Sequence, residues 1–199
     1  MPEIAQFQDL IRRVRDRDED AARELTVRYE KAIRRVVRIH LRDPRMRRVM
    51  DSMDVCQSVL TSFFVRTALG EYELDTPDQL INLLTTITRN KVVNQVQRHQ
   101  TQRRDIRRTI GLPMDSQGIV DRSPNPADDV SAKEILEKVR SQLDADERYL
   151  AEQRSEGKTW PELAEELNAT PAALRKKLSR ALDRAMVALG LDSDEQDDV

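Results

Sequence analysis

Residues 159–189 predict two short helices that meet at a tight corner, and this pattern strongly restricts the fold. A threonine stands where each helix would begin (Thr159 and Thr170), and threonine is a favoured N-cap residue. A proline lies in the first turn of each helix, where its missing N–H has no intrahelical partner to lose. Asn168 occupies the position between the helices that needs a left-handed backbone, a conformation that asparagine tolerates well. The pattern predicts a helix-turn-helix.

Each helix of this motif carries an apolar inner face at helical spacing. The inner faces comprise Trp160, Leu163, Ala164 and Leu167 in the first helix, and Leu174, Leu178, Ala181, Leu182 and Ala185 in the second. The outer face of the second helix is cationic and comprises Arg175, Lys176, Lys177, Arg180 and Arg184. These features are typical of a helix that enters the major groove of DNA, because arginine and lysine neutralise phosphates and read guanine. A basic surface helix in an ordinary bundle is the alternative interpretation.

The remainder of the chain also has helical periodicity, and the alternation that marks strands is almost absent. We expect helices over residues 4–15, 20–43, 52–69, 77–89, 90–108, 131–142 and 144–155, before the two at 160–167 and 171–189. Glycines and prolines without any period fill residues 109–130, which is typical of a linker. The predicted fold class is all-α, with two small helical domains (1–108 and 131–191), a flexible linker (109–130) and an acidic, disordered tail (192–199).

The apolar positions of residues 77–108 change phase near Arg89. One stripe comprises Leu80, Leu83, Leu84 and Ile87, and the next comprises Val92, Val93 and Val96. On one continuous helix the two stripes would lie on nearly opposite sides. We therefore expect a bend at residues 88–90. The bend would open a basic stretch made of Arg89, Lys91, Arg98, Arg103, Arg104, Arg107 and Arg108.

Residues 52–69 predict a helix with one apolar and one polar side. The apolar side comprises Val55, Cys56, Val59, Leu60, Phe63 and Phe64. The polar side comprises Asp54, Gln57, Ser58 and Thr61, spaced at i, i+3, i+4 and i+7. Periodicity alone favours a solvated face for these four side chains.

The sequence gives no indication of an enzyme. His40 and His99 lack metal-ligand partners at suitable spacing, a glycine-rich phosphate loop is missing, and Cys56 lies on the apolar stripe. We therefore expect no catalytic residue, no cofactor and no metal. A single cysteine, without an apolar signal segment or a membrane-length run, indicates a cytoplasmic protein. The net charge of −2 conceals basic segments that are opposed by the acidic tail.

Three segments together resemble the bacterial sigma factors of the extracytoplasmic-function (ECF) group. Asp54-Val55-Cys56-Gln57-Ser58-Val59-Leu60 is similar to the D-L-V-Q-E-x-F segment of that family. Residues 84–94 are similar to its L-Y-R-I-A-R-N-x-x-x-D segment, and residues 159–184 to its fourth region. Residues 143–148 stand where the family often has L-P-x-x-x-R, and residues 123–126 resemble its linker. The resemblance spans nearly the whole chain before the tail.

The resemblance implies a promoter-specificity subunit that directs core RNA polymerase to promoter DNA. Contacts to the polymerase would come from Asp54, Gln57, Ser58 and Thr61. A loop that captures a flipped base of the minus-ten element would be lined by Thr85, Thr86, Arg89 and Asn90, with Asn94 and Arg98 on the following helix. The minus-thirty-five element would be bound by Arg175, Lys176, Lys177, Arg180 and Arg184.

Two positions depart from the family pattern. Leu83 replaces the usual tryptophan, and Ser58 replaces the usual acid. A regulatory kinase that phosphorylates Ser58 or Thr61 could restore the missing charge, although the sequence favours the simpler explanation that a related subgroup tolerates Ser58.

Two alternative functions also remain, a helix-turn-helix regulator that acts without being a polymerase subunit and a helical protein-interaction module that does not bind DNA. The sequence leaves open the promoter, the regulon and any anti-sigma factor. It also leaves open whether the tail covers the basic face of the second domain or only aids solubility.

Overall fold

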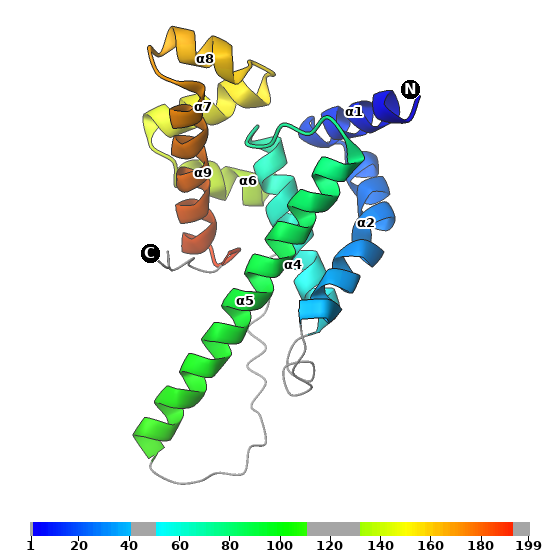
Figure 1. Cartoon of the computed structure of the whole chain (residues 1–199). Helices are drawn as coiled ribbons and strands as arrows, with labels where there is room; N and C mark the ends of the chain where they lie inside the picture. The colour runs from blue at the N-terminus through cyan, green and yellow to red at the C-terminus, as the bar shows by residue number, and fades with distance from the viewer. Residues whose placement is uncertain (1, 41–50, 111–131, 193–199) are drawn as a thin grey trace.

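The computed structural model describes residues 2–40, 51–110 and 132–192, and within these ranges the chain is helical without a strand (Figure 1). The predicted all-α fold class is therefore confirmed. The helices are α1 (Pro2–Arg15), α2 (Glu19–His40), α4 (Ser52–Ala68), α5 (Pro77–Ile110), α6 (Ala132–Ser141), α7 (Ala145–Ser155), α8 (Trp160–Glu166) and α9 (Pro171–Ala188). Residues 41–43, most of the predicted linker (111–130) and the tail beyond Asp192 lie outside the described residues.

The first bundle consists of α1, α2, α4 and α5 around one apolar core. Its fully buried side chains include Phe7, Leu25, Ile33, Phe63 and Leu80. Helix α2 is capped by Asp18, because its carboxylate accepts hydrogen bonds from the N–H groups of Asp20 and Ala21 in the first turn. Helix α5 is capped by Thr76, since the N–H of Gln79 donates to Thr76 Oγ1 at 3.3 Å.

The predicted bend at residues 88–90 is wrong, because α5 is one continuous helix (Figure 1). The position that the prediction missed is Thr88, which is fully buried between the buried residues Leu84 and Val92. Its hydroxyl donates to the carbonyl of Leu84 at 2.6 Å, so a polar side chain can lie in the core. The buried residues Leu84, Thr88 and Val92 are four positions apart, and each such step rotates the stripe around the helix axis by only about 40°. Val93, which the prediction placed in the second stripe, is 42% exposed.

The second bundle consists of α6, α7, α8 and α9, and its core extends into the first half of the chain. Val65, Ala68 and Leu69 of α4 and its C-cap belong to this second buried cluster, and Leu69 is fully buried there. Gly70 follows with a φ of +75°, and a Cβ at this position would overlap the backbone of Arg154. Helix α4 therefore contributes buried side chains to both cores.

Candidate nucleic-acid interface

The corner between α8 and α9 has the local geometry that the sequence predicts. Thr159 and Glu162 form a reciprocal capping box at the start of α8, and Thr170 Oγ1 accepts from the N–H of Ala173 at 3.2 Å to cap α9. Hydrogen bonds from Thr159 lower the pKa of Glu162. Asn168 has a φ of +49°, which provides the left-handed turn. Leu167, predicted to face inward, is instead 41% exposed because it lies at the C-cap of α8.

The cations predicted to contact DNA lie along the outer face of α9. Lys176 and Arg180 are exposed. Near the start of α7, Lys177 pairs with Asp146 at 2.9 Å, and Arg184 pairs with Glu147 at 2.7 Å. These two acids orient the basic side chains without covering them, since the Arg184 side chain remains 62% exposed. Arg175 contacts the first bundle and is described below.

The four residues predicted to contact the polymerase lie on one side of α4, but they differ in exposure. Asp54 and Gln57 are exposed, whereas Ser58 and Thr61 are half-buried. Ser58 is partly covered because Lys91 of α5 reaches it, with Lys91 Nζ donating to Ser58 Oγ at 2.9 Å. Only the N-terminal half of this side is therefore open to a partner in the described structure.

The residues predicted for the minus-ten element lie on a helix and do not line a loop. All six lie on α5, where Thr86, Arg89 and Asn90 are exposed and Thr85 and Asn94 are half-buried. Thr86 donates its hydroxyl to the carbonyl of Asn82 at 2.9 Å, a bond internal to the helix. Arg98 lies further along α5, and its side chain is outside the described part. The helix presents Thr85, Thr86, Arg89 and Asn90 on one side, because they are spaced at i, i+1, i+4 and i+5.

Comparison with known proteins identifies the family of this chain. A family model described as ECF sigma factor matches residues 4–191, a range that includes both bundles. The chain belongs to the ECF sigma factor family. Sigma factors of this family act in transcription initiation with core RNA polymerase and promoter DNA, and they are not enzymes. No curated protein and no solved structure matches the chain.

Cys56 of the sigma factor is buried. Its burial, and to a smaller extent the nearby Glu30, raises the pKa of its thiol to about 11, so the group is a thiol and not a thiolate at neutral pH. Among the described residues, no group of three His, Cys, Asp or Glu side chains could hold a metal ion. None of the described helices is both long enough and apolar enough to span a membrane.

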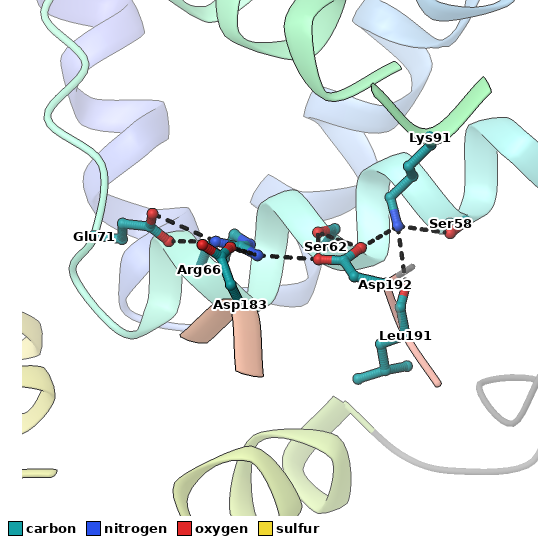
Figure 2. A network of polar contacts seen from close by, with 8 residues as sticks. All are labelled: Ser58, Ser62, Arg66, Glu71, Lys91, Asp183, Leu191 and Asp192. Atoms are coloured by element: carbon teal, nitrogen blue, oxygen red, sulfur yellow. Dashed lines mark hydrogen bonds and ion pairs between the residues drawn. The ribbon is translucent and has the colours of Figure 1, made fainter. Parts of the chain in front are cut away.

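A charged network that the sequence did not predict joins the two bundles of the sigma factor (Figure 2). Arg66 of α4 pairs with Glu71 at 3.1 Å, with Asp183 of α9 at 2.6 Å and with Asp192 at 3.0 Å. Burial alone would lower the pKa of Arg66, but Glu71 and the other acidic neighbours raise it. The sequence holds no signal for the contacts between the bundles, because Arg66 is separated from Asp183 and Asp192 by 117 and 126 positions.

The second link between the bundles of the sigma factor centres on Glu73, in the loop between α4 and α5. Its carboxylate pairs with Arg154 of α7 at 3.2 Å and with Arg175 of α9 at 3.0 Å. Both guanidinium groups also lie over the ring of Trp160, at 4.5 and 5.8 Å from its centre. One predicted DNA contact, Arg175, is therefore occupied by a carboxylate of the first bundle.

Proposed function

We propose that this sigma factor binds the minus-thirty-five element through the outer face of α9 and the minus-ten element through the exposed side of α5. The exposed side of α4 around Asp54 and Gln57 would bind core RNA polymerase. The observation that carries the proposal is the helix-turn-helix, in which the exposed cations Lys176 and Arg180 lie on the helix that follows the left-handed Asn168 turn. The family match supports the polymerase and promoter as partners.

Transcription in vitro with purified core polymerase and a promoter library tests this function. We expect initiation from a defined subset of sequences only when the sigma factor is present. A protein that bound these sequences without polymerase and directed no initiation would instead be a separate regulator. A protein-interaction module would show no salt-dependent DNA affinity, whereas each neutralised phosphate adds about 0.9 to the logarithmic salt slope on duplex DNA.

Replacing Asn90 with alanine should change the minus-ten preference and leave polymerase binding intact. Asn90 is exposed on α5, and alanine favours a helix more than asparagine does, so the substitution keeps the helical propensity of this segment. Loss of one base contact corresponds to roughly 1–3 kcal/mol, or about a 5- to 160-fold change in selectivity at one promoter position. Sequencing the transcripts from a library randomised in the minus-ten element measures this change.

Asn82→Ala is the matched control, because Asn82 is also exposed on α5 but precedes the family-like segment. It should leave the minus-ten preference unchanged. Weaker polymerase binding by the Asn90→Ala variant would contradict a role in DNA recognition and indicate a role in folding.

A further inference from the structure

We propose that the second bundle docks on α4 in an autoinhibited closed state that is fastened by Asp192, and that core RNA polymerase binds after this contact opens. The inhibitory part rests on the proposed polymerase-binding role of α4. The closed state is the arrangement in Figure 1, where the end of α9 and residues 189–192 lie beside α4 and α5.

Asp192 contacts three side chains on two helices of the first bundle, α4 and α5. Its carboxylate pairs with Lys91 of α5 and, at 3.0 Å, with Arg66 of α4, and it accepts a hydrogen bond from Ser62 Oγ at 3.0 Å (Figure 2). Lys91 Nζ also donates to the carbonyl of Leu191 at 2.9 Å. The side chains of Arg66, Lys91 and Asp192 are only 9, 12 and 15% exposed. Bonds between charged groups that are shielded from water in this way are stronger than those at a surface.

Lys91 shows why this fastening depends on Asp192. Burial lowers the pKa of Lys91, and the carboxylate of Asp192 acts in the opposite direction. Without that carboxylate, the closed state would keep Lys91 in a poorly solvated place without an acidic partner, beside Arg66, which still pairs with Glu71 and Asp183. An uncompensated buried charge is costly. The chain can avoid that cost by separating the bundles, which returns Lys91 to water.

The docked bundle covers part of the side of α4 that is proposed to bind polymerase. Ser58, Ser62 and Val65 continue the line that Asp54 begins, because they follow it at i+4, i+8 and i+11. Ser58 is reached by Lys91, Ser62 donates to Asp192, and Val65 is buried in the second core. Ser58 is thus covered from α5, and a partner that followed this side of α4 beyond Ser58 would meet the second bundle at Ser62 and Val65.

The same closed state also occupies a predicted DNA contact. Glu73 of the first bundle pairs with Arg175 of α9 at 3.0 Å, where a DNA phosphate would otherwise bind the guanidinium group. Opening of the Asp192 contact would release both the α4 side and Arg175. One conformational change would thus make polymerase binding and promoter binding available together.

A charge reversal at Asp192 in the full chain tests the proposal. Asp192→Lys places a third cation beside Lys91 and Arg66, whereas Asp194→Lys makes the same charge change two residues later in the sequence and serves as the control. Cysteines introduced at Val27 and Glu165, which are exposed on α2 and α8, carry a donor and an acceptor dye. The native Cys56 is buried and does not compete for the labels. Energy transfer reports docking, and a fluorescence titration with core polymerase reports affinity.

We expect Asp192→Lys to lower energy transfer and to tighten polymerase binding, with neither change in Asp194→Lys. If the closed state holds nine-tenths of the molecules, complete opening tightens the apparent Kd by about tenfold. Unchanged energy transfer in Asp192→Lys would overturn Asp192 as the fastening residue. Lower energy transfer with unchanged polymerase affinity would overturn autoinhibition and leave the sigma-factor role intact. If no variant bound polymerase, the proposed polymerase contact itself would be overturned, and the inhibitory part with it.

Discussion

Replacing Lys176 and Arg180 together with alanine should lower promoter DNA affinity by about 10- to 100-fold at physiological salt. Both side chains are exposed on the outer face of α9, and neither contributes to the core. If each neutralises one phosphate, the slope of log affinity against log salt should fall by about 1.8, since one phosphate contributes about 0.9. Fluorescence anisotropy of labelled promoter DNA across a salt titration measures both quantities.

The matched control removes the same charge from a different helix. Lys133 and Lys138 are exposed on α6, outside the helix-turn-helix, so their double alanine variant should keep the salt slope close to that of the original protein. An equal loss of slope in both variants would show that net charge, and not the α9 face, determines DNA affinity. Polymerase affinity should remain unchanged in both variants.

Replacing Trp160 with alanine should lower the free energy of unfolding of the second bundle by about 3–5 kcal/mol. The Trp160 side chain is only 1% exposed and is among the largest fully buried groups of the described chain. The substitution leaves a cavity in the second core and removes the ring beneath the guanidinium group of Arg154. Urea unfolding followed by circular dichroism measures the change without depending on tryptophan fluorescence.

Leu167→Ala provides the comparison on the same helix. Leu167 is 41% exposed at the end of α8, so its truncation should cost less than about 1 kcal/mol. Equal destabilisation by the two variants would contradict the role of Trp160 as the centre of this core. DNA binding by Trp160→Ala should fail together with folding, because α9 packs on the same cluster.

Local signals in the sequence were sufficient to predict the helix-turn-helix. Thr159, Thr170 and Asn168 act within one or two turns of their own positions, and the structure places each of them as expected. The spacing of Leu174 and Leu178 likewise predicted their burial. The roles of the candidate DNA and polymerase contacts stay predictions, although their positions on α4, α5 and α9 follow from the same helical periodicity.

The bend predicted in α5 was wrong because an argument from apolar periodicity counts every polar residue as exposed. Thr88 is buried, and its hydroxyl donates to the carbonyl of Leu84, so the apolar stripe continues through a polar residue without a bend. The acidic tail also differs from either expected role at its first residue. Asp192 pairs with Lys91 and Arg66 of the first bundle, and it neither covers the basic outer face of α9 nor lies free in solvent.

The sequence by itself determined where most helices begin and end, which faces are apolar and which helix carries the cations, because these properties depend on neighbours a few residues away. The tertiary structure alone decided that α4 contributes to two cores and that Glu73 and Asp192 join the two bundles. These ion pairs connect residues about 100 positions apart, as Lys91 and Asp192 do. Such pairing depends on how the folded bundles meet, so it cannot be predicted from the spacing of residues along the chain.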